Sequence, residues 1–258
     1  MLKTKYNKMK TVLQYLLFVL IITELSISCS KDDSTMEPKH PYNGKTTAEF
    51  NPDVQYGTLT DIDGNIYRTV TIGTQTWMAE NLRTSRLNDG TKLTHAVTFN
   101  DWEYANSATF GMYNNYTNAD TIATYGYFYN WKAVETGKLA PEGWHVPTKA
   151  EWDILINSIG GYNTLGAYYK LLEKGILHWP SPNSAATNQT GFTAIPSGRR
   201  YINGQDAKMG EEARYWTSTI TDPDFSTNWI NEIILTSTYI ASGDNSTEAG
   251  LSVRCVKD

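Results

Sequence analysis

The segment GWHVPTKAEWDILINSIGG, residues 143–161, contains a nearly complete set of signals for one helix. Thr148 and Glu151 stand at the spacing of a capping box, in which the threonine hydroxyl accepts from the Glu151 amide and the glutamate reaches back. Pro147 precedes the cap and keeps the chain extended at that point. The sequence therefore predicts a helix that begins directly after Thr148.

The following residues place apolar side chains on one face of that helix. They recur at helical spacing: Trp152, Leu155, Ile156 and Ile159. Gly160 and Gly161 then supply the glycine that commonly ends a helix. Because the requirements of a scaffold explain the whole segment, we expect Trp144 and Trp152 to lie in the core rather than in an active site.

Residues 56–82, before the helix, consist of short runs rich in β-branched side chains. The sequence DGN at residues 63–65 separates two of them, and Gly and Asn tolerate the positive φ of a hairpin turn. Asp61, Asp63 and Asn65 also suggest a calcium loop, but the full loop frame that ends in Glu is absent. The pattern predicts a hairpin.

Residues 83–125 contain scattered aromatic residues among many Asn and Thr residues, which predicts a long irregular excursion with one or two short strands. A second helix is expected from about Leu165 to Lys174, with Gly175 as its stop signal. Further strands are expected at 191–202, 213–220, 229–235, 237–242 and 250–258. Strands, a long loop region, two helices and strands again form an α+β pattern.

Several stretches together resemble a known family: GNIYRTVTIGTQTWMAENLRT, YGYFYNWKAV, APEGWHVPTKAEWD, GFTAIPSGRR, YWTST and GLSVRCVKD. They are similar, in this order, to the Fibrobacter succinogenes major paralogous domain over about residues 56–258. That domain is in turn similar to the C-type-lectin-like and sulfatase-modifying-factor fold. The resemblance implies a twisted antiparallel sheet with two helices, neighbouring termini, and surface lipoproteins of unassigned biochemical role.

The start of the chain predicts export. Four lysines precede a short apolar run at residues 12–22, and a small-residue segment then leads to Cys29. A transmembrane helix needs roughly 20 apolar residues, and this run is shorter. A short apolar run after a basic start is typical of a secretory signal peptide. A cysteine at this junction resembles a bacterial lipoprotein signal, although Leu25 lies one place further back than usual. We expect a lipoprotein signal at 1–28 and lipid on Cys29; a plain secreted protein is the alternative.

Residues 29–55 are expected to form a flexible acidic tether to the domain at 56–258. Lys31, Asp32 and Asp33 follow Cys29 and resemble the acidic export tag of surface lipoproteins of the Bacteroidetes. A multiply acylated cysteine anchors stably in a membrane. The expected location is therefore the outer membrane, with the domain held by its lipid and facing the exterior.

The charge argues against nucleic acid as a partner. The formal net charge is −5, and it becomes more negative once the lysine-rich signal is removed. Binding to phosphates requires a basic surface. With Cys29 lipidated, Cys255 has no mate among the two cysteines, so the domain folds without a disulfide and relies on its core.

The titratable residues do not predict catalysis, a metal site or a cofactor. Relatives on the resembled fold that generate formylglycine use reactive cysteines with copper, but Cys255 stands alone in an apolar strand. The four histidines, His40, His95, His145 and His178, are far apart and lack ligand spacing. We expect a protein that is not an enzyme, and keep a formylglycine-generating oxidoreductase as an alternative.

The aromatic residues point instead to binding. The calcium motifs of C-type lectins are absent from the sequence, but aromatic rings can stack on sugars or peptides without calcium. The candidate ligand-binding residues are Trp102, Tyr104, Tyr113, Tyr116, Trp179 and Tyr201. The expected role is a non-catalytic binding module for a glycan, a peptide or a partner protein. A structural or adhesin subunit of a surface assembly is a further alternative.

Overall fold

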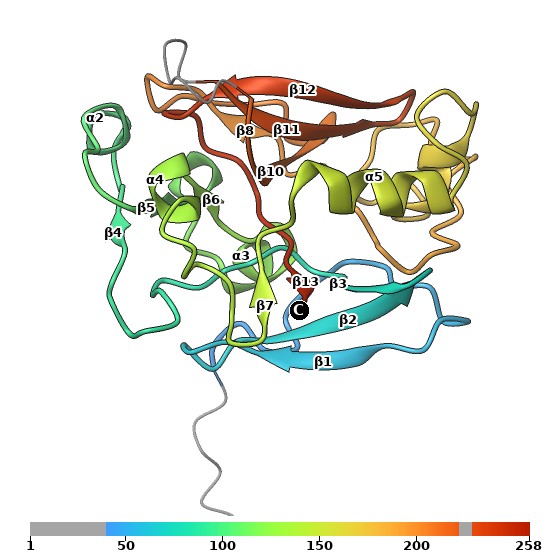
Figure 1. Cartoon of the computed structure of the whole chain (residues 1–258), viewed down its shortest axis with the longest axis horizontal. Helices are drawn as coiled ribbons and strands as arrows, with labels where there is room; N and C mark the ends of the chain where they lie inside the picture. The colour runs from blue at the N-terminus through green and yellow to red at the C-terminus, as the bar shows by residue number, and fades with distance from the viewer. Residues whose placement is uncertain (1–39, 222–228) are drawn as a thin grey trace, which may run out of the picture. The chain divides into compact units, whose positions relative to one another are not determined.

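The computed structural model describes residues 40–221 and 229–258, and His40–Asp258 forms one compact unit. Helices and antiparallel sheets are mixed in it, which confirms the α+β class (Figure 1). Cys29, the expected signal at 1–28 and residues 29–39 of the expected tether lie outside the described residues. Among the helices described, none has the length and hydrophobicity needed to cross a membrane.

The first sheet is five-stranded and antiparallel, with the spatial order β1-β2-β3-β13-β7. Its strands are β1 (Gly57–Thr60), β2 (Ile66–Ile72), β3 (Gln75–Met78), β13 (Val256–Lys257) and β7 (Trp144–His145). The predicted hairpin is confirmed, because β1 pairs with β2 and Gly64 in the turn has a φ of +86°. The last strand therefore joins the sheet that the first three strands begin.

A second antiparallel sheet contains β10 (Glu212–Ile220), β11 (Trp229–Thr236) and β12 (Ile240–Ser246). The predicted helix is confirmed as α5 (Lys149–Ser158), and Thr148 and Glu151 form both bonds of the capping box. Trp152 is fully buried, and its ring lies 4.7 Å from Trp77 and 5.4 Å from Tyr215. One side chain of α5 thus packs against both sheets.

The described residues also form two smaller sheets. One contains β4 (Thr94–His95), β5 (Thr109–Gly111) and β6 (Phe128–Tyr129), and the other contains β8 (Arg199–Arg200) and β9 (Asp206–Ala207). The stretches 191–202 and 250–258, which are predicted to be strands, are mostly irregular, because the strands within them are only the short β8 and β13. Around Thr193, which has a φ of +55°, the carbonyls of Phe192 and Thr193 turn to accept from the buried Arg254 guanidinium instead of a neighbouring strand.

The region expected to be irregular contains more helix than predicted. It holds α2 (Phe99–Glu103), α3 (Ala119–Tyr125) and the short 3₁₀ helix η1 (Tyr113–Asn115), and α4 (Trp131–Val134) follows it. Thr98 with Asp101 forms a capping box for α2, and Asn118 caps α3. These helices were missed because their caps stand in a stretch of polar residues without a clear apolar period.

The second helix, predicted from about Leu165 to Lys174, is wrong in length and type. The structure has a single 3₁₀ turn there, η2 (Ala167–Lys170). Gly166 before it is left-handed, with a φ of +83°, and Leu172 after it forms a β-bridge with Ala194. Leu171 and Leu172 are fully buried. Packing these side chains against residues near 194 stabilises the protein more than a longer helix would.

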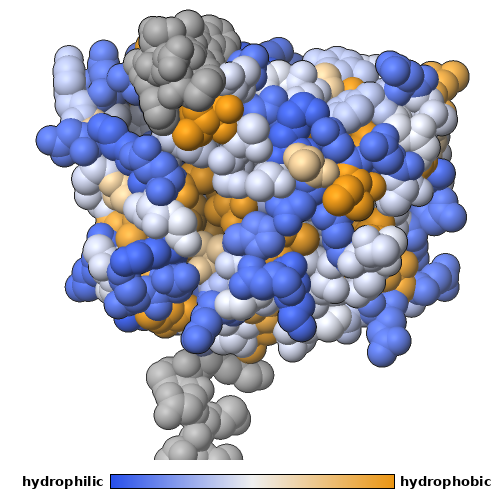
Figure 2. Space-filling model, in the orientation of Figure 1, coloured by the Kyte–Doolittle hydropathy of each residue, from blue (hydrophilic) through white to orange (hydrophobic). Residues whose placement is uncertain are grey.

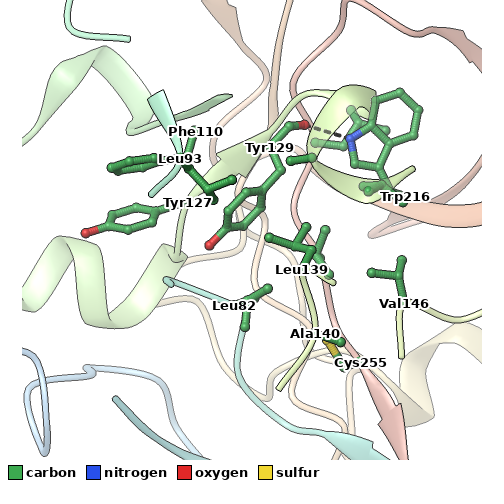
Figure 3. Packing of buried hydrophobic residues seen from close by; sticks show 14 of the residues in the cluster. Leu82, Leu93, Phe110, Tyr127, Tyr129, Leu139, Ala140, Val146, Trp216 and Cys255 are labelled. Carbon is green, nitrogen blue, oxygen red and sulfur yellow. Dashed lines mark hydrogen bonds between the residues drawn. The ribbon is translucent and has the colours of Figure 1, made fainter. Parts of the chain in front are cut away.

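The buried residues form two large clusters and one small one. The first includes Tyr129, Trp216 and Cys255 (Figure 3). Trp144 packs against this cluster but is only partly buried. The Trp216 indole donates to the Tyr129 carbonyl at 2.7 Å. The second cluster surrounds Trp152, so the core position expected for Trp152 is confirmed.

Residues 40–55, which were expected to belong to the tether, pack onto the domain. The Asn43 side chain bonds to the backbone of Gly64 and Ile66, and the Asn51 amide donates to Asn188. The Phe50 ring lies under the Arg68 guanidinium at 4.1 Å. The compact unit therefore begins near His40 rather than near Tyr56.

Candidate functional site

Two of the six aromatic candidates are buried. Trp102 is 3% exposed and Trp179 is 1% exposed, and their indole N–H groups donate to the carbonyls of Glu248 and Ala194. Both rings pack the domain and offer no free face to a ligand. Sequence reasoning could not separate them from surface rings, because burial depends on contacts with segments distant in the chain.

Tyr104 and Tyr201 are exposed but stand apart from an aromatic partner. Tyr104 follows α2 and is 75% exposed. The Tyr201 ring stacks with the Arg199 guanidinium at 4.5 Å, and its hydroxyl accepts from Arg199. Among the described residues, neither ring packs against another aromatic ring.

Tyr113 and Tyr116 are brought together on one turn, residues 112–116. Their ring centroids lie 6.4 Å apart with an interplanar angle of 27°. Tyr116 is 45% exposed and Tyr113 is half-buried. Asn114 and Asn115 between them have φ values of +46° and +53°, a left-handed conformation that places both rings on the same side of the turn. This pair is the part of the predicted set that the fold assembles.

A buried ion pair holds this turn in place. The side chains of Arg200 and Asp206 are both fully buried, and Arg200 Nε lies 2.7 Å from Asp206 Oδ1. Arg200 also donates to the Met112 carbonyl at 2.8 Å, and Asp206 accepts from the Asn114 amide at 2.6 Å. Because charged hydrogen bonds of this kind are strong in a buried site, they hold the left-handed turn in one conformation.

The β8–β9 hairpin positions this ion pair. Arg200 lies on β8, opposite Asp206 on β9. Gly204 in the connecting turn has a φ of +77° and lies against the backbone of Phe99, where a side chain would collide. The sequence analysis missed the ion pair, but the Asn203-Gly204 dipeptide is a hairpin signal that could have located it.

A third tyrosine lies near the pair. Burial raises the pKa of Tyr125 to about 12, and the nearby Glu173 and Tyr116 add to the shift. The Tyr125 ring meets His178 edge-on at 5.6 Å. The Tyr125 hydroxyl therefore remains protonated at neutral pH and can act as a hydrogen-bond donor.

Thr47, His178 and Glu173 form a chain that is similar in geometry to a catalytic triad. His178 Nδ1 lies 2.7 Å from the buried Glu173 carboxylate, and Nε2 lies 3.0 Å from the Thr47 hydroxyl. A nucleophile of this type also needs amide donors for an oxyanion. The amides of Thr47, Ala48 and Glu49 are already bonded to Thr124, Thr46 and Glu173. The chain therefore fastens residues 46–49 to the domain.

Cys255 lies inside the first core cluster. It is fully buried, and burial raises the pKa of its thiol well above the usual value, with a further contribution from Asp61. Figure 3 shows its sulfur beside Ala140. A protonated thiol without solvent access is a poor nucleophile and a poor metal ligand.

A polar cavity of about 250 Å³ lies beside the β1–β2 turn, with Asp61, Arg86 and Glu142 among its lining residues. The Asp61 carboxylate accepts from the Tyr67 hydroxyl at 2.6 Å and from the Asn65 amide. Arg86 is paired with Asp63 at 2.5 Å. Asp61 and Arg86 therefore hold the turn, and within the described residues no group of metal-ligating side chains is assembled.

Comparison with family models matches residues 70–257 to the Fibrobacter succinogenes major domain. No curated protein and no solved structure matches the chain.

Proposed function

The chain belongs to the Fibrobacter succinogenes major domain family, and from this premise we propose that it is a non-catalytic binding module. The observation that carries the proposal is the Tyr113–Tyr116 pair, held on a left-handed turn by the buried Arg200–Asp206 pair. Preorganised aromatic rings bind at low entropic cost, and the Asn side chains of the turn supply hydrogen bonds. A glycan, a peptide or a partner protein is the expected class of ligand.

The strand order of the first sheet also supports a finer fold assignment. We infer a C-type-lectin-like arrangement in which α5 packs between the two larger sheets and the last strand returns beside the first three. The order β1-β2-β3-β13 supports it, because β13 pairs with β3. An experimental structure compared with lectin-like folds would test this assignment.

The proposed location is the outer membrane, facing the exterior, with a lipid on Cys29. The basic start, the short apolar run and the cysteine support it. Cells grown with a labelled fatty acid should incorporate label into the wild type and not into Cys29→Ser. Label-free wild-type protein in a soluble fraction would contradict the anchor.

The binding test is a glycan and peptide array with the full chain, in calcium and in chelator. Tyr113→Ala and Tyr116→Ala should each weaken binding at least about tenfold, the typical cost of a stacked ring. Tyr239→Ala is the matched control, because Tyr239 is 46% exposed and lies on the turn before β12. Loss of binding with chelator would contradict the calcium-free proposal.

Two alternatives have their own readouts. Oxidation of a thiol peptide with added copper would favour the formylglycine-generating oxidoreductase, whereas the buried, protonated Cys255 argues against that chemistry. No binding on the array together with no oxidation in the copper assay would favour the structural or adhesin subunit of a surface assembly.

A further inference from the structure

A groove of about 560 Å³ lies beside the C-terminal end of β2, and it shares no residue with the 112–116 turn. Its walls come from Val54–Gly57, from Thr69–Thr71 and from Thr76. These lining side chains are small, hydroxylated, apolar or amide, and none of them carries a formal charge. The groove is therefore suited to a neutral ligand.

The groove exists because β1 is shorter than β2. The two strands pair from Thr60↔Ile66 to Gly57↔Thr69, and the chain before Gly57 has left the sheet. On its other side, β2 stays paired with β3 as far as Ile72. The end of β2, the arrow tip at the right of the sheet in Figure 1, therefore has a neighbouring strand on one side only.

The backbone of Thr71 is directed at this open side. The Arg68 carbonyl accepts from the Ala79 amide, so Arg68 directs its backbone groups toward β3. Since alternate residues of a strand direct these groups to opposite sides, those of Thr71 are directed away from β3. Across the parts of the chain that the structure describes, neither the N–H nor the C=O of Thr71 has a hydrogen-bond partner.

We propose that this groove binds an uncharged, extended peptide segment, which adds a strand beside the open end of β2. A peptide backbone offers a donor and an acceptor at the spacing of a strand, and it satisfies both groups of Thr71. The hydroxyls of Thr71 and Thr76 lie 3.0 Å apart on the groove wall and bond to each other. Charged side chains would have no partner among the lining residues.

The test uses the isotope-labelled full chain and a capped peptide of alternating threonine and valine. Titration should shift the Thr71 amide resonance in a saturable manner and slow its hydrogen exchange. The same peptide with N-methylated backbone amides should not bind, because it cannot donate to the Thr71 carbonyl. This comparison leaves the protein unchanged, so it does not depend on a variant that folds.

Thr71→Pro removes the free N–H together with the hydroxyl that bonds to Thr76. It keeps the ladder to β3, which uses the neighbours of Thr71, and proline is tolerated at such open positions. It should weaken binding about fivefold or more, the effect of one lost hydrogen bond. Thr58→Pro is the matched control. Gly57 and Leu59 are directed at β2, so the Thr58 N–H lies on the outer edge of β1, away from the groove.

Three results would overturn the proposal: no saturable shift at Thr71, equal weakening by both proline variants, or equal binding of the N-methylated peptide. Binding of a lysine-containing or glutamate-containing peptide as tight as that of the neutral peptide would overturn the requirement for an uncharged ligand. Saturable binding of a neutral oligosaccharide at Thr71, unchanged in Thr71→Pro, would overturn a peptide ligand.

Discussion

At the scale of single residues, Trp152 has the largest structural effect that we can predict. Its ring contacts Trp77, Phe192 and Tyr215 and is fully buried. Trp152→Ala should lower the free energy of unfolding by about 3–5 kcal/mol, because it leaves a large cavity between α5 and the sheets. Denaturant titration measures this change, and a loss below about 1 kcal/mol would show that the cavity collapses or that the ring is not part of the core.

His145 connects the start of α5 to the last residue of the chain. Its Nε2 lies 2.7 Å from Glu151, and its Nδ1 lies 2.6 Å from Asp258. Burial lowers the pKa of His145, but the hydrogen bonds to Asp258 and Glu151 outweigh it and raise the pKa above the ordinary value of 6.5. Burial raises the pKa of Glu151, but hydrogen bonds from Thr148 and His145 outweigh it and lower the pKa below its ordinary value. The Glu151 carboxylate therefore stays charged at the pH values where His145 titrates.

The expected result is a stability that depends on pH. A group whose pKa is raised by folding stabilises the protein fully below its unfolded pKa, and the effect is lost as the pH rises through the folded pKa. The difference in unfolding midpoint between the wild type and His145→Gln should therefore be larger near pH ~5.5 than near pH ~8.5. A difference that is equal at both pH values would contradict a protonated His145.

At the scale of elements, the 112–116 turn depends on the packing of β5 against β8. Gly111 on β5 has no side chain, and a Cβ there would collide with the Arg200 guanidinium. Gly111→Ala should displace Arg200 from Asp206 and Met112, which releases the turn. We expect faster amide exchange at 112–116 and weaker ligand binding, with the α5 amides unchanged. Unchanged exchange in the turn would show that Arg200 can move without loss of its bonds.

The elements also show where sequence reasoning succeeds. Helix α5 was predicted because its cap, its apolar face and its terminal glycines agree with one another. The 112–116 turn could not be predicted in this way, because its geometry depends on Arg200 and Asp206, which lie more than eighty residues away in the chain. No local pattern records such a contact.

At the scale of the whole molecule, residues 40–55 close the domain. The Asn43 side chain holds the β1–β2 turn, and Thr47 and Glu49 are held by His178 and Glu173. A chain that begins at Tyr56 should therefore unfold at a lower temperature than one that begins at His40, and by several degrees for a loss of about 1–2 kcal/mol. Equal melting temperatures would place the domain boundary at Tyr56, as the sequence pattern alone suggested.

The family follows from the several stretches that resemble it. Local sequence patterns also predict the α+β class, the first hairpin, helix α5 and the core position of Trp152, because periodicity, capping and turn chemistry act between residues close together in the chain. Three features became evident only in the folded domain: Trp102 and Trp179 are buried, Tyr113 and Tyr116 form a pair, and the end of β2 is left open. Burial and strand register depend on contacts between distant segments, and such contacts are made only when the whole domain packs.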